Sequence, residues 1–203
     1  MEHKKVVVFN GDDASPEVMI PAVEILEEMG LPLSFEYPLI GQDAIDSVGE
    51  NFPDSTRVAI DSADATFFGS TSGQSTAALF YLRWGKQTYA NVRPCEWMPG
   101  FRSPLAKPEG VDFVVIRENL EDLYLGLEGD IEDLHALNFY SKHARSNLTD
   151  LGPGRYAIKA ITEKGSERII RHAFELASKL SLIHISEPTR RTPIAYAVFC
   201  LKK

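Results

Sequence analysis

The sequence predicts an α/β fold, in which a mostly parallel sheet with flanking helices is followed by the start of a second α/β domain. Short apolar runs alternate with helical patterns over the first third of the chain, and such alternation is typical of βαβ units. A segment rich in Pro and Gly, residues 99–108, interrupts this pattern and indicates a crossover between two domains. A second set of strand and helix patterns then extends to residue 180.

The first part of the chain predicts three strands with helices between them. Strands are expected at residues 6–9, 33–37 and 65–68. The first helix is expected to begin after Ser15 as its N-cap, with Pro16 in its first position, and to end at Gly30. The order strand, helix, strand predicts parallel pairing, because parallel strands need a crossover connection.

The second part predicts further strands and one long helix. Strands are expected at residues 111–117, 123–127 and 156–161. A helix is expected from about residue 163 to 179. Its apolar stripe consists of Ile169, Ala173, Phe174 and Ala177. The acidic residues between positions 128 and 133 are interpreted as a solvated turn rather than a metal site, because charged runs are usually exposed.

Composition favours a protein of the cytoplasm. The chain has 203 residues, a formal net charge of -8 and a pI near 5.2, which argues against nucleic acid as the main partner. No apolar run is long enough to span a membrane and no secretory leader is apparent. The two cysteines, Cys95 and Cys200, have no metal-ligand or disulfide-framework spacing, which suits a reducing compartment.

Two blocks concentrate the residues that point to function. Residues 82–94 (LRWGKQTYANVRP) contain Arg83 and Arg93, and residues 112–124 contain Arg117. Arginine presents a planar, permanently charged fork that recognises carboxylates, and several arginines on an acidic protein attract a small polyanion. The alternative for any single arginine is a solvated surface side chain.

These blocks resemble the isocitrate/isopropylmalate dehydrogenases. The resemblance covers about residues 5–180 and is carried by four motifs in order. They are GDDASPEV at 11–18, LR through YANVRP at 82–94, IREN with a tyrosine at 116–124, and ITE with SERI and AFE at 161–175. These are metal-dependent β-decarboxylating dehydrogenases that oxidise a malate-type 2-hydroxy acid with a nicotinamide cofactor. The resemblance therefore implies an isopropylmalate-dehydrogenase-like fold and this activity.

The resemblance also implies roles for particular residues. Arg83, Arg93 and Arg117 would form a substrate clamp on the carboxylates of a small 2-hydroxy di- or tricarboxylate. Tyr124 would be catalytic and help to protonate the enolate carbon, a plausible task for a phenol; the alternative is an aromatic residue packing on its strand neighbours.

The resemblance implies NAD or NADP and Mg²⁺ or Mn²⁺ as cofactors, and a homodimer for the full-length parent. The family's metal-binding aspartates and its adenine-binding segment lie beyond the part of the chain that resembles it. The sequence therefore assigns no metal ligand within this chain, and the cofactor-binding residues are unknown.

The residues before Arg83 bear on which acid is used. Family members that take isocitrate carry a serine and an asparagine six and four positions before this arginine, where the present chain has Ala77 and Leu79. An apolar pair suits an alkyl group better than a third carboxylate. An alkylmalate or tartrate is therefore favoured over isocitrate, although Ser75 and Thr76 could supply a hydroxyl if the loop shifts by one residue.

The domain prediction has three parts. Residues 1–104 are assigned to the N-terminal part of the large dehydrogenase domain, and residues 105–180 to part of the small, dimerisation domain. Residues 181–203 contain four basic and one acidic residue, lack the family's lysine and aspartate motifs and resemble a translated sequencing adapter, so they are predicted to be a non-native tail; the alternative is a divergent native tail.

We therefore expect the N-terminal, truncated half of a larger enzyme. The alternative is a non-catalytic truncated product that at most binds polycarboxylates or self-associates.

Overall fold

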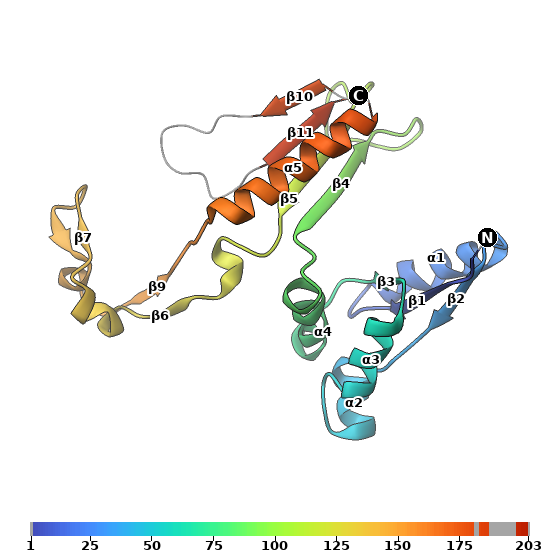
Figure 1. The fold of residues 1–203 in the computed structure, drawn as a ribbon, viewed down its shortest axis with the longest axis horizontal. Helices are drawn as coiled ribbons and strands as arrows, with labels where there is room; N and C mark the ends of the chain where they lie inside the picture. Colours follow the sequence, from blue (N-terminus) through green and yellow to red (C-terminus); the bar gives the residue numbers. More distant parts are fainter. Residues whose placement is uncertain (1, 181–182, 187–197, 203) are drawn as a thin grey trace. The chain divides into compact units, whose positions relative to one another are not determined.

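The computed structural model describes residues 2–180, 183–186 and 198–202. The chain forms two compact units, Met1–Lys86 and Gln87–Lys203, which are each described by themselves below (Figure 1). None of the helices within the described residues is long and apolar enough to cross a membrane.

The first unit is a three-stranded parallel sheet with helices around it. Its elements are β1 (Lys4–Phe9), α1 (Pro16–Glu28), β2 (Leu33–Glu36), α2 (Gly41–Val48), α3 (Asp54–Ser62), β3 (Ala65–Phe68), a 3₁₀ turn η1 (Gly73–Ser75), α4 (Thr76–Phe80) and a π-helical turn η2 (Tyr81–Gly85). The strand order is β2–β1–β3, and both pairings are parallel. The predicted α/β fold with a parallel sheet is thereby confirmed.

Both faces of β1 are buried, because helices cover the two sides of the sheet. Val7 and Phe9 pack with Ala59 and Ile60 of α3. Val8, which points to the opposite face, packs with residues of α1. This burial on two sides explains the uninterrupted apolar run that the sequence showed at residues 6–9.

Ser15 occupies the N-cap position that the sequence predicts, with Pro16 as the first residue of α1, but its side chain does not cap the helix. Its backbone is already helical and its side chain makes no capping hydrogen bond to α1. Its Oγ instead accepts a hydrogen bond from the backbone N–H of Ser70, at 2.9 Å. The side chain therefore joins the start of α1 to the loop after β3.

The second unit contains the remaining elements. They are β4 (Ala90–Glu96), β5 (Asp112–Glu118), η3 (Leu123–Leu125), β6 (Glu128–Asp130), η4 (Ile131–Leu137), β7 (Tyr140–Ser141), β8 (Ser146–Asn147), η5 (Leu148–Leu151), β9 (Arg155–Ala157), α5 (Glu163–Leu180), β10 (Ile183–Ser186) and β11 (Val198–Lys202). The main sheet has the order β10–β11–β5–β4 with antiparallel neighbours. Two small antiparallel ladders, β6–β9 and β7–β8, complete the unit.

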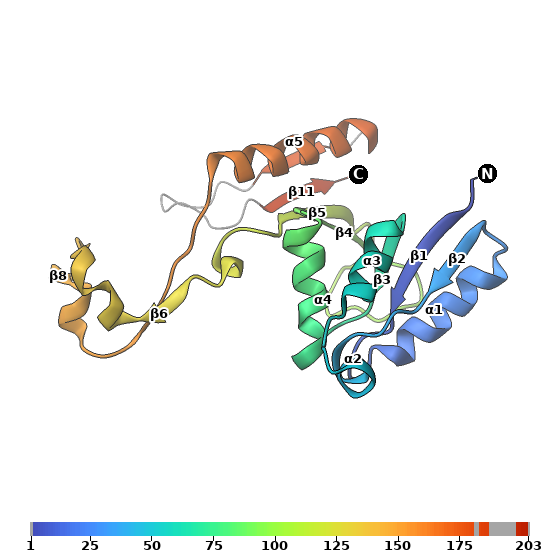
Figure 2. The ribbon, with the colours of Figure 1, turned by 60° about the horizontal axis from the view of Figure 1, so that its bottom comes forward.

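Helix α5 covers one face of the main sheet, which Figure 2 shows from the side. The core residues are Val114, Ile116, Ile169, Ala173 and Ala177. Three of the four residues in the predicted apolar stripe of this helix are thus buried, whereas Phe174 is half exposed.

Three sequence-based assignments differ from the structure. The Pro- and Gly-rich residues 99–108 lie in the connection between the paired strands β4 and β5, and the two units divide after Lys86 instead. The strand expected at 123–127 is replaced by the 3₁₀ turn Leu123–Leu125, because the backbone angle φ is positive at the residues on either side of the turn, Asp122 and Gly126. The strand expected at 156–161 is shortened to β9, Arg155–Ala157.

The acidic residues between 128 and 133 serve the local backbone. Asp130 and Asp133 form a reciprocal capping box at the start of η4, and Asp130 also pairs with Arg155 at 2.8 Å. The predicted non-native tail contributes the backbones of β10 and β11 to the main sheet; its residues 187–197 lie outside the described residues.

Candidate functional site

Arg83 lies on the π-helical turn η2 of the first unit. The turn is closed by a hydrogen bond from the backbone N–H of Lys86 to the carbonyl of Tyr81, at 3.0 Å. The Nε atom of Arg83 is buried, and this burial lowers the pKa of the guanidinium, because burial disfavours a charged form. A cation that has lost part of its hydration favours an anionic ligand.

Arg93 and Arg117 share one face of the β4–β5 ladder. Asn91 stands directly opposite Arg117 in the antiparallel register, and residues directly opposite point to the same face. Arg93 follows Asn91 by two positions on β4 and therefore also points to that face. A hydrogen bond of 3.1 Å from Arg93 Nε to Asn91 Oδ1 is consistent with this arrangement.

Tyr124 lies beside Arg117. The guanidinium carbon of Arg117 is 4.5 Å from the centroid of the Tyr124 ring, which is a cation–π contact. The tyrosine is on the 3₁₀ turn η3 and is 37% exposed. The structure thus brings Arg93, Arg117 and Tyr124 together within the second unit, whereas Arg83 belongs to the first unit and its membership of the substrate clamp stays a prediction.

Asp122 fixes the start of the turn that carries Tyr124. It is 5% exposed and has φ 71° and ψ -146°, a region that costs a residue other than glycine about 1–3 kcal/mol. Its Oδ1 accepts a hydrogen bond from the N–H of Leu123 at 2.7 Å, and its own N–H donates to the carbonyl of Ala160 at 2.8 Å. Sequence analysis missed this residue, because the strained backbone of an aspartate has no sequence signature.

Glu118 connects the end of β5 to α5. Its carboxylate accepts two hydrogen bonds from Arg168, at 2.8 and 3.1 Å, and two from the backbone N–H groups of Asn119 and Leu120. The side chains of Glu118 and Arg168 are only 13% and 23% exposed. This pair therefore fixes the backbone that immediately follows Arg117.

The comparisons with known proteins identify the family of the chain. The model of the family "Isocitrate/isopropylmalate dehydrogenase" matches residues 5–187. The chain belongs to the isocitrate/isopropylmalate dehydrogenase family. The resemblance that the sequence motifs indicated is therefore confirmed.

Individual proteins of this family are similar to the chain over most of its length. A 3-isopropylmalate dehydrogenase of Archaeoglobus fulgidus is 34% identical over 197 residues, which cover 93% of this chain and 52% of that protein. A 3-isopropylmalate/3-methylmalate dehydrogenase of Methanocaldococcus jannaschii is 32% identical, covering 85% and 45%. The crystal structure of isocitrate dehydrogenase from Methylococcus capsulatus aligns with a TM-score of 0.68 at 28% identity, covering 89% and 49%. The chain thus spans about half the length of the relatives it matches.

The described residues contain no cluster of metal-ligating side chains. Within residues 2–180, 183–186 and 198–202, no three His, Cys, Asp or Glu side chains lie close enough to hold a metal ion. The arginines and the tyrosine of the β4–β5 site are not ligands that Mg²⁺ or Mn²⁺ prefers.

The turn at Gly11 is packed closely against the loop after β3. A Cβ at Gly11 would meet the Ser70 carbonyl at 2.3 Å. Asp12 binds the loop after β3 through the N–H of Ser72 at 2.7 Å and the hydroxyl of Ser75 at 3.0 Å. The close packing of the two loops therefore explains the glycine.

The segment before Arg83 lies on η1 and α4. Ala77 and Leu79 are both partly buried, whereas Phe80 is half exposed and its ring contacts Trp84 edge to face, at 5.5 Å. Ser75, the alternative source of a hydroxyl, is 4% exposed and donates to Asp12. Phe80 therefore presents an exposed apolar ring three positions before Arg83.

Proposed function

We propose that this chain carries the substrate-binding arginines of an NAD(P)-dependent oxidative decarboxylase for a malate-type 2-hydroxy acid. The observation that carries the proposal is the shared face of β4 and β5, on which Arg93 and Arg117 lie with Asn91 between them and Tyr124 beside Arg117. Two guanidinium groups on one face match a ligand that has more than one carboxylate.

In this function the arginines bind and orient the acid. Arg93 and Arg117 each hold a carboxylate, with Arg83 as the third member of the substrate clamp. Acceptance of the C2 hydride and polarisation of the resulting carbonyl would be the chemistry of a bound nicotinamide and a bound divalent cation. When carbon dioxide departs, the electron pair of the broken carbon–carbon bond stays on the organic product, which becomes an enolate. Tyr124 Oη then delivers a proton to carbon 3 of this enolate.

The contact between Arg117 and Tyr124 supports the proposed role of the tyrosine in this site. A cation 4.5 Å from the ring centroid holds the ring against the residue that binds the substrate. The η3 turn, fixed by Asp122, directs the phenol from the adjoining backbone. The residue proposed to bind the substrate, Arg117, and the residue proposed to deliver the proton, Tyr124, are therefore in direct contact.

The proposed substrate is an alkylmalate or tartrate rather than isocitrate. Leu79 and Phe80 precede Arg83 on the same helical segment, and apolar side chains favour an alkyl group over a third carboxylate. The names of the A. fulgidus and M. jannaschii relatives, which refer to isopropylmalate and methylmalate, support this choice. We expect the whole protein to be a cytoplasmic homodimer.

Binding of the acid by this chain tests the proposal. Isothermal titration with 3-isopropylmalate, tartrate and isocitrate should show weaker binding of isocitrate. Arg93→Lys should weaken binding roughly tenfold to a hundredfold, because losing a charge-assisted hydrogen bond costs about 1.5–3 kcal/mol. The matched control is Arg102→Lys, an exposed arginine on the loop between the two strands, which should bind as the unaltered chain does. Equal affinities of the unaltered chain, Arg93→Lys and Arg102→Lys for the acid would remove Arg93 from the site.

A further inference from the structure

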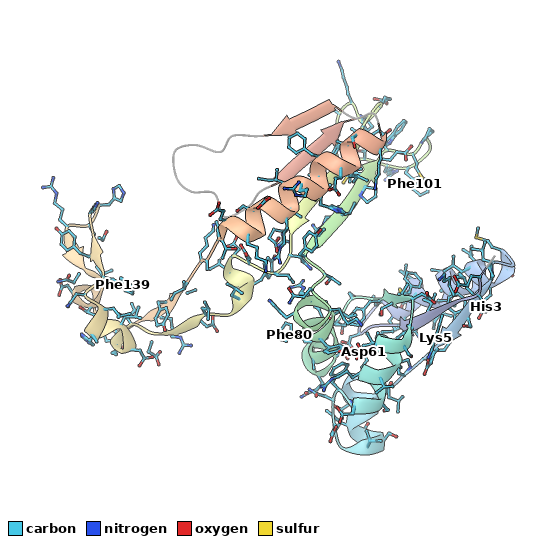
Figure 3. All side chains as sticks on the ribbon, viewed as in Figure 1. His3, Lys5, Asp61, Phe80, Phe101 and Phe139 are labelled. Carbon is cyan, nitrogen blue, oxygen red and sulfur yellow. The ribbon has the colours of Figure 1, made fainter. Side chains whose placement is uncertain are left out.

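The two ends of the turn that carries Arg83 are joined to one carboxylate. The hydroxyl of Tyr81 donates to Asp61, at 2.8 Å from Oδ1 and 2.9 Å from Oδ2. The ammonium group of Lys86 donates to the same Oδ1 at 2.9 Å. We call these three residues the Asp61 bridge. Asp61 belongs to α3, where Figure 3 labels it.

This contact depends on the wide form of the turn. In an α-helix, side chains five positions apart point about 140° away from each other. Residues 81 and 86 are five positions apart, yet both bind Asp61. They can do so because η2 is π-helical: the N–H of Lys86 bonds to the carbonyl of Tyr81, five residues earlier. The side-chain bridge and the backbone hydrogen bond therefore favour the same conformation.

A second set of contacts supports the same form. A Cβ at Gly85 would lie 2.7 Å from Cδ2 of the Tyr81 ring, so the missing side chain allows the ring to lie against the turn. The guanidinium of Arg57, also from α3, is 5.3 Å from the centroid of the same ring, and Phe52 packs on it at 5.4 Å. The Tyr81 hydroxyl is thus directed towards Asp61 by packing on its ring.

We infer that Asp61 is a positioning residue, which holds the turn Tyr81–Gly85 in its π-helical form and so sets the direction of the Arg83 side chain. A change from the π to the α form would rotate every residue between the two ends about the helix axis, Arg83 included. The part concerning substrate rests on the proposed function, because it requires that Arg83 binds a carboxylate. The part concerning the turn is independent of any ligand.

The hydrogen bond of the turn gives the first readout. Nuclear magnetic resonance detects scalar coupling across a hydrogen bond, and the unaltered chain should show coupling between the Lys86 nitrogen and the Tyr81 carbonyl. In Asp61→Asn and Lys86→Met, which both remove the ion pair, this coupling should be lost and replaced by coupling to the Leu82 carbonyl. Lys86→Arg keeps the cation and should retain the Tyr81 coupling.

Asp64→Asn is the matched control for this measurement. Asp64 is also an exposed aspartate that binds a lysine, Lys4, at 3.0 Å. Within the described residues its hydrogen bonds come from Lys4 and from the backbone N–H of Lys5, not from the turn. Retention of the Tyr81 coupling in both Asp61→Asn and Lys86→Met would overturn the inference. Loss of the coupling in Asp64→Asn would also overturn it, since the effect would then be one of general destabilisation.

Titration with 3-isopropylmalate gives the second readout. Asp61→Asn and Lys86→Met should weaken binding about twofold to fivefold, the range that an exposed ion pair contributes. Lys86→Arg, which keeps the cation, should bind as the unaltered chain does. If the single variant Arg83→Lys binds more weakly but the single variant Asp61→Asn binds as the unaltered chain does, the positioning role is refuted. Unchanged binding in Arg83→Lys would refute the proposed function at Arg83, and the coupling measurement would then decide the part concerning the turn.

Discussion

Replacing Glu118, the last residue of β5, by Ala should destabilise the second unit far more than removing an exposed glutamate of α5. The carboxylate of Glu118 accepts four hydrogen bonds, two from Arg168 and two from backbone N–H groups. The substitution removes all four and leaves the guanidinium of Arg168 in a site where its side chain is only 23% exposed. The cost arises mainly from this cation, which loses its partner without regaining full hydration.

The expected loss is about 2–3 kcal/mol. Breaking a fully buried ion pair by removing one partner costs about 3–5 kcal/mol, and the partial exposure of this pair reduces that figure. The loss should lower the melting temperature of the second unit by roughly 8–20 °C. Glu167→Ala is the matched control: Glu167 also pairs with an arginine of α5, Arg171 at 2.6 Å, but both side chains are 66% exposed. Its loss should cost at most about 0.5 kcal/mol.

Urea unfolding followed by the fluorescence of Trp97 measures this difference. The two tryptophans of the chain lie in different units, so Trp84→Phe leaves a fluorophore that reports on the second unit alone. The free energies of unfolding are comparable when the urea dependence is the same in all variants. A difference between Glu118→Ala and Glu167→Ala of less than about 0.5 kcal/mol would show that the pair behaves as a surface contact, and would refute this reasoning.

Three further outcomes are expected. Ile116→Ala should cost about 2–5 kcal/mol in the same urea experiment, because the fully buried side chain leaves a cavity under α5; a loss below this range would mean that the helix closes over the gap. Thr162→Ala should cost about 1 kcal/mol and speed amide exchange in the first turn of α5, since its Oγ1 accepts the N–H of residue 165; unchanged exchange would remove its capping role. The pKa of Asp61 is held below its ordinary value of 3.8 by the hydrogen bond from Lys86 and then that from Tyr81. Because the folded pKa is the lower one, this stabilisation is present above about pH 4 and is lost as the pH falls further. Between about pH 6 and pH 3 the melting temperature should therefore fall less steeply in Asp61→Asn than in the unaltered chain. Parallel curves of melting temperature against pH would contradict the assignment.

The sequence was informative wherever a side-chain period determines the structure. The apolar run 6–9 predicted β1, and the spacing of Ile169, Ala173 and Ala177 predicted the buried face of α5. The sequence-based prediction failed where a backbone angle determines the structure. The residues after Asp122 are apolar and typical of a strand, but the positive φ of Asp122 favours the 3₁₀ turn η3 instead. Composition alone also did not separate the long β4–β5 connection from a domain linker, because both are rich in Pro and Gly.

The candidate site was predictable in its residues but not in its arrangement. The motifs named Arg93, Arg117 and Tyr124, and the antiparallel register then placed the two arginines on one face. That register is a property of two strands distant in the sequence, so no local pattern contains it. Glu118 and Arg168 are likewise 50 positions apart, and their pairing emerges only when α5 packs on the sheet.

The strict alternation of β4 and β5 limits how these strands can change length during evolution. Ile116 faces α5, while Arg117 beside it faces the opposite side of the sheet. Inserting one residue within β5 would reverse the faces of every residue beyond it, and would exchange a buried apolar side chain for a charged one. Inserting two residues would keep the faces and shift only the pairing. The loop between the strands has no such parity, so variation in its length leaves the arginine face intact.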